Sequence, residues 1–291
     1  MKYTGPIYRP PYEANSLLLQ VTVGCTHNKC TFCTMYRDVK FTTESIEQIE
    51  KDLKEAKQLY GNVKRVFLVN GNAFVLSAKR LKPIAELIIK YFPSVKVITM
   101  YASINNIKSK TDEELFELQR LRINDLWVGV ETGHKETLNY MNKGFTLKDS
   151  YKQLERLNKA GIRHIDIIIF GAAGRNRGQQ NAIDTARLIN ASKPMGISIT
   201  TMGAFGESEL AKDVKSGKYV PATELEVLEE QKKFIELVEV ESAYLGIHGI
   251  NTVTFDAFLP RDKEKAIKFV DESIERLDDV FLESVPERFS I

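Results

Sequence analysis

Residues 17–33 read LLLQVTVGCTHNKCTFC, in which an apolar, β-branched run stops at Gly24 and a loop with three cysteines follows at once. Such a run is typical of a buried strand, because about four to eight consecutive apolar residues ending at a turn residue suit a strand covered on both faces. The cysteine loop is therefore expected at the carboxyl end of the first strand of a sheet.

Strand-like and helix-like segments alternate after this loop. Apolar residues at helical spacing predict helices at 43–60, 78–91, 112–120, 147–160 and 180–192, and β-rich runs predict strands at 65–69, 96–101, 125–130, 164–170 and 196–201. Parallel strands need helix-length crossovers, which this alternation supplies. The predicted fold class is α/β, a partial (βα)6 TIM-like barrel of parallel strands with helices outside; a doubly wound sheet also fits the pattern.

The alternation ends after Met202. Helical patterns follow at 207–218, 223–239 and 263–277, with a short mixed segment at 252–258. No Ser/Gly-rich linker marks a separate domain. We therefore expect residues 1–205 to form the partial barrel and residues 206–291 to form a mainly helical C-terminal extension packed on it.

Composition restricts the class of protein. The 41 basic and 39 acidic side chains nearly balance, and no basic block indicates a nucleic-acid partner. No stretch has the apolar core of a signal peptide or the roughly 18 apolar residues of a membrane span. All three cysteines lie between Cys25 and Cys33, an odd count with no distant disulfide partner. We expect a cytoplasmic protein without a membrane partner.

The cysteine loop itself indicates a metal centre. Cys25, Cys30 and Cys33 are separated by four and then two residues. One interpretation is a structural zinc site completed by His27, since zinc accepts three Cys and one His. However, the loop follows a strand of an α/β sheet, where such folds place active sites. A [4Fe-4S] cluster normally has four thiolate ligands, so three would leave one iron for a non-protein ligand.

This loop resembles that of radical S-adenosylmethionine (radical SAM) enzymes, whose usual spacing is three and two residues with an aromatic residue before the last cysteine. Phe32 occupies the aromatic place, and one extra residue lies between Cys25 and Cys30. The resemblance implies a [4Fe-4S] cluster on Cys25, Cys30 and Cys33, S-adenosylmethionine (SAM) as the second cofactor, and reductive cleavage of SAM to a 5′-deoxyadenosyl radical. It also implies an electron donor such as flavodoxin or ferredoxin.

Segments after the second and third strands resemble SAM-binding motifs of this family. Val69–Ala73 looks like the Gly-Gly-Glu segment that receives the methionyl ammonium group, which implies contacts from Asn70, Gly71 and Asn72. A plain turn is the alternative, because Asn-Gly is a common turn pair. Ser103 follows the third strand and is a candidate hydroxyl contact, although serine is also favoured in turns.

Two later strand ends complete the resemblance. Glu131 lies in a segment similar to the Gly-x-Glu-Ser-Gly motif of the methylthiotransferase, Elongator-type and oxygen-independent coproporphyrinogen oxidase branches, which implies contact with the ribose hydroxyls. A local Arg or Lys partner is the alternative. Gly171 lies in a segment resembling the Gly-x-Pro-Gly strand end that borders the adenine, and a packing glycine is its alternative.

Other residues receive no firm role. His27 and His164 are not assigned, because single histidines are more often structural. Residues 245–251 and 259–263 resemble a tail seen in uncharacterised members of the superfamily, and His248 and Asn251 are a substrate-side hypothesis. A further cysteine for a second cluster is lacking, so we expect a small-molecule substrate of unknown identity. A zinc-stabilised α/β binding protein and an iron–sulfur cluster carrier remain as alternatives.

Overall fold

The computed structural model describes residues 1–288 of the chain. These residues group into two compact units. The first comprises Met1–Asn28, Tyr36–Gly129 and Lys152–His164, and the second comprises Lys29–Met35, Val130–Tyr151 and the chain from Ile165 onward. The division passes through the cysteine loop, between Asn28 and Lys29.

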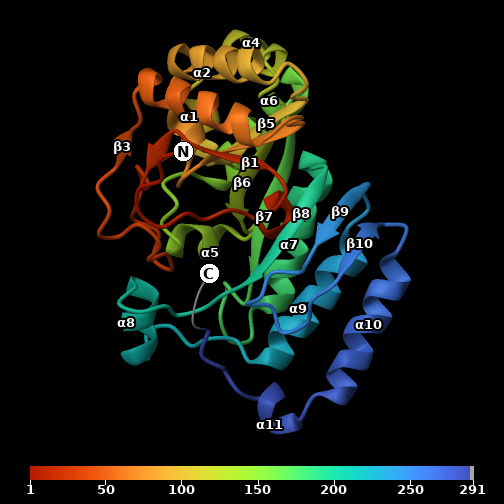
Figure 1. Cartoon of the computed structure of the whole chain (residues 1–291). Coiled ribbons are helices and arrows are strands. Elements are labelled where there is room, and N and C mark those ends of the chain that lie inside the picture. The colour runs from red at the N-terminus through yellow and green to blue at the C-terminus, as the bar shows by residue number, and fades with distance from the viewer. Residues whose placement is uncertain (289–291) are drawn as a thin grey trace. The chain divides into compact units, whose positions relative to one another are not determined.

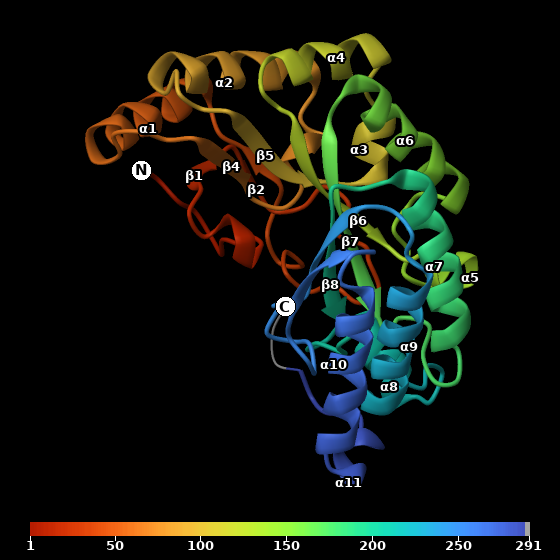
Figure 2. The same ribbon diagram turned by 90° about the vertical axis from the view of Figure 1, so that its right-hand side faces the viewer.

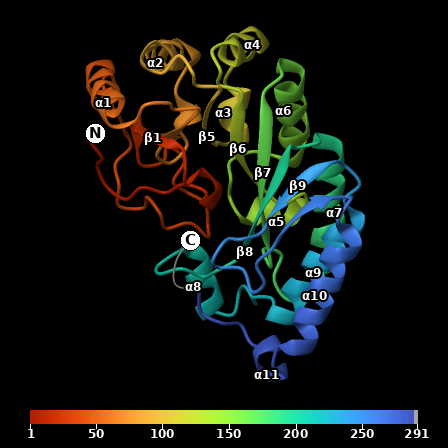
Figure 3. The ribbon, with the colours of Figure 1, turned by 45° about the vertical axis from the view of Figure 1, so that its right-hand side comes forward.

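The first unit carries parallel strands in the order β1 (Leu17–Gln20), β4 (Arg65–Val69), β5 (Val97–Ala102) and β6 (Asp125–Glu131), whose last two residues belong to the second unit. A small antiparallel pair is formed by β2 (Thr22–Val23) and β3 (Thr42–Thr43). Its helices are α1 (Ile46–Leu59), α2 (Ala78–Tyr91), α3 (Ile104–Lys108) and α4 (Asp112–Arg120), with 3-10 turns η1 (Pro11–Glu13) and η2 (Ala73–Val75). Helices α1, α2 and α4 lie side by side (Figures 1 and 3).

The second unit carries strands in the order β7 (Arg163–Phe170), β8 (Gly196–Thr201), β9 (Ser242–Leu245) and β10 (Asp256–Leu259), with only the last pair antiparallel. The first two residues of β7 belong to the first unit. Its helices are α5 (Lys135–Tyr140), α7 (Gly178–Ser192), α8 (Glu209–Lys215), α9 (Glu224–Leu237), α10 (Lys263–Arg276) and α11 (Asp279–Leu282). Helix α6 (Leu147–Ala160) starts in this unit and ends in the first. Figure 2 shows α7, α9 and α10 packed side by side.

Buried apolar side chains form a core in both units. In the first, Leu19 and Leu68 pair across β1 and β4 and are both fully buried. In the second, Ile199 of β8 and Phe234 of α9 share one apolar cluster with Tyr244 of β9. Each such side chain contributes about 1.5–3 kcal/mol to folding when fully buried. Helix α9, from the predicted extension, therefore belongs to the same core as β8.

The alternation of parallel strands and helices confirms the predicted α/β class. Elements β4, β8, α2, α4 and α6 have the predicted bounds. The strand predicted at 17–23 is divided, because its last residues leave β1 and pair with β3. The helix predicted from 43 begins at Ile46, since Ser45 caps it by accepting a hydrogen bond from the N–H of Gln48. The domain boundary at residue 205 stays a prediction.

Strand β9 was not predicted, and β10 lies at the end of the segment expected to be mixed. Both are four residues long, too short for a clear alternating pattern. Within residues 1–288, no helix is long and apolar enough to cross a membrane.

Candidate functional site

Hydrogen bonds hold both halves of the cysteine loop. In the second unit, the N–H of Thr31 donates to the carbonyl of Met141 (3.2 Å), and the N–H of Leu210 donates to the carbonyl of Thr31 (2.9 Å). In the first unit, Asn28 Nδ2 donates to the carbonyl of Tyr36 (2.7 Å). Each half is thus tied to its own unit.

The three cysteines are half-buried thiols, not disulfides. Cys25 belongs to the first unit, and Cys30 and Cys33 belong to the second, where the N–H of Cys33 donates to the carbonyl of Cys30 (3.3 Å). Among the described residues, no group of three or more His, Cys, Asp or Glu side chains is close enough to hold a metal ion. The assignment of the three thiols as metal ligands stays a prediction.

A buried lysine lies beside the second half of the loop. The side chain of Lys143 is 12% exposed, and its Nζ is 5.9 Å from the centroid of the Phe32 ring. Burial tends to lower the pKa of Lys143, but the negative charges of the Glu131 carboxylate and of the Cys30 and Cys33 thiolates outweigh burial and raise that pKa well above its usual value. A fixed positive charge therefore stands next to two of the predicted ligands.

Phe32 also has a packing role. Its ring lies against a small apolar cluster of Met141, Ile169 and Ala172. This contact fixes the loop between two cysteines against the end of β7. A contact between Phe32 and a cofactor stays a prediction.

Glu131 ends β6 with a left-handed backbone conformation, φ 68°. Its Oε1 lies 2.5 Å from Nζ of Lys143. The local lysine partner considered as an alternative is therefore present. Glu131 Oε2 has no hydrogen-bond partner in the part of the chain that the structure describes, so it remains an acceptor for a ligand.

The turn after β4 contains buried polar atoms without partners. The side chains of Asn70 and Asn72 are 1% and 8% exposed. Nδ2 of Asn70 and Oδ1 of Asn72 find no hydrogen bond within residues 1–288. Between them Gly71 has φ 56°, and a side chain there would overlap the carbonyl oxygen of Gly24. Such atoms are rare in folded proteins and indicate a missing polar partner.

Ser103 has a local structural role. Its Oγ accepts from the N–H of Asn106 (3.4 Å), and Oδ1 of Asn106 accepts from the N–H of Ser103 (2.9 Å). This reciprocal pair is a capping box at the start of α3. The preference of serine for turns and helix starts therefore accounts for Ser103. A contact between Ser103 and SAM stays a prediction.

Residues of the C-terminal extension fix the turn at Gly171. The N–H of Gly171 donates to Oε2 of Glu230 (2.9 Å), and its carbonyl accepts from the hydroxyl of Tyr219 (2.9 Å). Oε1 of Glu230 accepts from Asn181 Nδ2 (2.5 Å), and burial raises the pKa of Glu230 to about 8. Glu230 could not be predicted as a site residue from the sequence, because an acidic residue in a helical pattern usually faces solvent.

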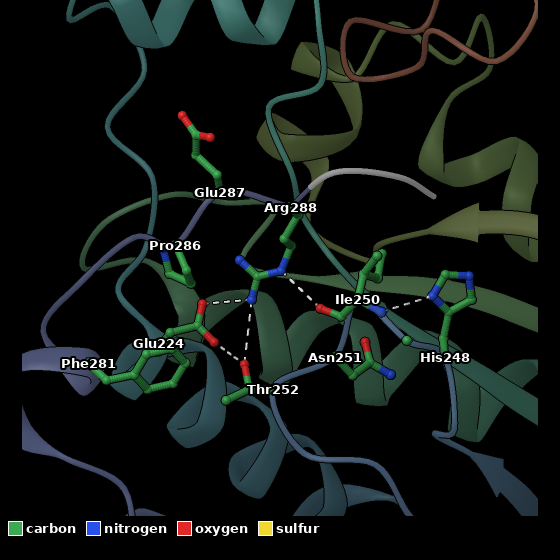
Figure 4. Close-up of a pocket in the computed structure, with 10 residues that line it drawn as sticks. Glu224, His248, Ile250, Asn251, Thr252, Phe281, Pro286, Glu287 and Arg288 are labelled. Atoms are coloured by element: carbon green, nitrogen blue, oxygen red, sulfur yellow. Dashed lines mark hydrogen bonds and ion pairs between the residues drawn. The ribbon is translucent and has the colours of Figure 1, made fainter.

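The other residues singled out in the sequence have different places in the structure: Asn251 holds a loop, and His248 lines a cavity. Asn251 Nδ2 donates to the carbonyls of Ile199 (2.9 Å) and Gly246 (3.0 Å), and Oδ1 accepts from Thr201 (3.1 Å). Asn251 therefore fastens its loop to β8. His248 lines a cavity, and burial lowers the pKa of its imidazole (Figure 4). His164 is buried in β7 and His27 is half-buried.

Sequence comparison finds relatives over most of the chain. An uncharacterised protein of Methanocaldococcus jannaschii, MJ0486, is 23% identical over 75% of this chain and 68% of that protein. The heme chaperone HemW of Bacillus subtilis is 21% identical over 80% of this chain and 61% of that protein. The chain thus spans about two thirds of the length of these relatives.

Solved structures show the same fold. Coproporphyrinogen III oxidase (HemN) of Escherichia coli, a radical SAM enzyme, matches with a TM-score of 0.59 and 17% identity over 76% of this chain and 52% of that one. Elp3 of Methanocaldococcus infernus matches with a TM-score of 0.55 and 12% identity over 90% of this chain and 64% of that one. These matches confirm the predicted fold class.

The family model described as the radical SAM superfamily matches residues 19–189. This range contains the cysteine loop and the turns at Gly71, Glu131 and Gly171. Because the match covers more than half of the sequence, the chain belongs to the radical SAM superfamily.

Proposed function

We propose that this enzyme holds a [4Fe-4S] cluster on Cys25, Cys30 and Cys33 and cleaves SAM reductively. When bound, the reduced cluster would supply one electron to a carbon–sulfur bond of SAM, which splits into methionine and a 5′-deoxyadenosyl radical. The observation that carries the proposal is the three-cysteine loop inside the region matched by the family model. Three thiolates suit such a cluster and leave one iron for SAM.

The buried atoms of the turn after β4 fit the methionyl end of SAM. Oδ1 of Asn72 is an acceptor without a partner among residues 1–288, as an ammonium group requires, and Nδ2 of Asn70 is a matching donor for a carboxylate. Gly71 lets the backbone between them approach a ligand closely. We propose that Asn70, Gly71 and Asn72 orient SAM.

Glu131 and Lys143 have complementary proposed roles. Oε2 of Glu131 would accept hydrogen bonds from the ribose hydroxyls, while Lys143 holds the other carboxylate oxygen in place. The positive charge of Lys143 also stabilises negatively charged ligands at Cys30 and Cys33. Ser103 and Gly171 are proposed to border the nucleoside, and Phe32 to exclude water from the loop.

The substrate, the electron donor and the compartment are also proposals. A small-molecule substrate is favoured because the sequence has no further cysteine for a second cluster. Reduction of the cluster requires a donor such as flavodoxin or ferredoxin. Cysteines confined to one loop suit the reducing cytoplasm.

Metal analysis and SAM binding test the proposal against its alternatives. The protein is purified anaerobically, reconstituted with iron and sulfide, and examined for iron, zinc and binding of radiolabelled SAM by equilibrium dialysis. We expect about four irons per chain, as one cube requires, and SAM binding that is lost in Cys30→Ala. Stoichiometric zinc without SAM binding would support the zinc protein, and a labile cluster without SAM binding would support the carrier.

A further inference from the structure

A cavity of about 690 Å³ lies within the second unit at the carboxyl ends of β7 and β8. Gly171, which follows β7, and Met202, which follows β8, both line it. So does Thr34, the residue after Cys33. Pockets for small molecules have this size, and α/β folds place active sites at this end of their strands. The cavity is therefore a suitable site for a substrate.

Most of the cavity wall is apolar. Its side chains include Met202, Phe205, Leu210, Val214, Val227 and Pro286. Walls of this kind bind the apolar body of a ligand, and a few polar groups then fix its orientation. The polar groups of this wall therefore indicate the class of ligand.

Arg288 is the charged group that the structure holds most firmly in this wall. Its side chain is 9% exposed, and Nη2 lies 2.6 Å from Oε1 of Glu224. Its Nε donates to the carbonyl of Ile250 (2.9 Å), as Figure 4 shows. Nη1 has no hydrogen-bond partner in the described residues, although it carries two N–H donors. Nη2 also donates to Oγ1 of Thr252 (3.4 Å), so Nη1 is the guanidinium nitrogen left to bind a ligand.

Residues 286–288 line two cavities. One is the cavity described above, which Val285 also lines, and the other has a volume of about 600 Å³ and is bordered by His248 (Figure 4). The buried pair with Glu224 holds the segment in this position. Lys215 and Glu287 add opposite charges to the first cavity wall. Preference for an anion must therefore come from the directed donors of Arg288.

We propose that the segment of residues 285–288 is a wall of the substrate pocket and that Arg288 binds the carboxylate of a substrate with an apolar body. This inference rests on the proposed function and names its substrate class. Hydrogen bonds between guanidinium and carboxylate are stronger than those to neutral acceptors. Because Glu224 already orients the guanidinium, binding costs little ordering of that side chain.

Two matched probes test the proposal. Naphthalene-1-acetate and naphthalene-1-acetamide have the same aromatic body and differ in charge. Their affinities for the anaerobically reconstituted protein are measured by isothermal titration calorimetry. We expect the carboxylate to bind at least about tenfold more tightly, as one charge-assisted hydrogen bond allows.

Variants assign this preference to one side chain. The double variant Arg288→Met/Glu224→Gln removes both charges of the buried pair, so that neither is left unpaired, and we expect it to bind both probes equally. Arg276→Met is the control, because Arg276 lies on the exposed face of α10 and pairs with Glu272. It should keep the wild-type preference.

The outcomes separate this inference from the proposed function. Equal binding of the two probes to the wild type, or binding of neither, would overturn the inference without any variant. So would a preference that persists in the double variant. If the same wild-type preparation forms 5′-deoxyadenosine but shows no preference, only the inference fails. If it shows the preference but forms no 5′-deoxyadenosine, the carboxylate site stands and the proposed function fails.

Discussion

The Nζ atom of Lys143 lies 2.5 Å from Oε1 of Glu131, so that the carboxylate at the end of β6 is neutralised by a cation that also stands near Cys30 and Cys33. The two side chains are 12% and 7% exposed. A pair buried to this extent is costly to break, because the remaining charge loses both water and its partner.

Removal of one partner should therefore destabilise the protein more than removal of both. We expect Lys143→Met to lower the free energy of unfolding by about 3–5 kcal/mol, and Lys143→Met/Glu131→Gln to recover much of that loss. Urea denaturation measures both. The control Lys159→Met removes an exposed lysine paired with Glu155 and should cost less than about 1 kcal/mol. Equal losses in Lys143→Met and Lys159→Met would contradict the buried pair.

The close approach of Gly71 to Gly24 gives a second prediction. Gly71→Ala should lower the free energy of unfolding by about 2–5 kcal/mol, because the new methyl group overlaps a carbonyl oxygen and the backbone is left-handed. It should also reduce iron content, since Gly24 precedes Cys25. Gly61→Ala is the matched control, with no atom of the described residues within 4 Å of the new methyl group. Equal stability and iron content in the two variants would show that the turn tolerates a side chain at residue 71.

The metal content of a His27 variant distinguishes an iron–sulfur cluster from a zinc site. A tetrahedral zinc site with three cysteines would need His27 as its fourth ligand, whereas a [4Fe-4S] cluster with an open iron would not. We expect His27→Ala to retain about four irons per chain, the content of one cube, while Cys30→Ala loses them. Zinc in the wild type that disappears in His27→Ala would instead show that the loop is a zinc site.

The raised pKa of Glu230 should make the stability of the protein depend on pH. Burial raises the pKa of Glu230 to about 8 in the folded protein, above the ordinary 4.5 expected for the unfolded chain. Between these values the folded protein keeps a proton that the unfolded chain releases. Its contribution to stability therefore falls as pH rises through this window, by up to about 1.4 kcal/mol per pH unit.

Glu230→Gln removes this titration. Urea denaturation at pH 5 and pH 8 should show that the wild type loses more stability than the variant over this range. The control Glu229→Gln changes a neighbouring exposed carboxylate of the same helix and should follow the wild type. Parallel pH profiles for wild type and Glu230→Gln would show that Glu230 does not bind its proton more tightly in the folded state.

Local sequence patterns predicted the strands and helices that position the site. The run ending at Gly24 and the apolar periodicities around 78–91 and 147–160 gave elements close to the observed ones. Family membership and the cofactor pair of this superfamily, a [4Fe-4S] cluster and SAM, follow from the motifs and are confirmed by the family match. These features depend on residues near one another in the chain.

Partners from distant segments could not be predicted. Lys143 reaches Glu131 from a loop after α5, and nothing in its neighbours distinguishes it from a surface lysine. Glu230 meets Gly171 from α9, which packs on α7, and Tyr219 reaches Gly171 from the segment between α8 and α9. Arg288 likewise lines the cavity in a position that its contact with Glu224 holds. Such contacts require the three-dimensional arrangement.

Formation of 5′-deoxyadenosine is the measurement that tests the proposed cleavage of SAM. The anaerobically reconstituted protein is reduced with dithionite, SAM is added, and 5′-deoxyadenosine and methionine are quantified beside the Cys30→Ala variant. We expect both products in equal amounts from the wild type and neither from the variant. A cluster-loaded wild type that yields no 5′-deoxyadenosine, or a variant as active as the wild type, would contradict it.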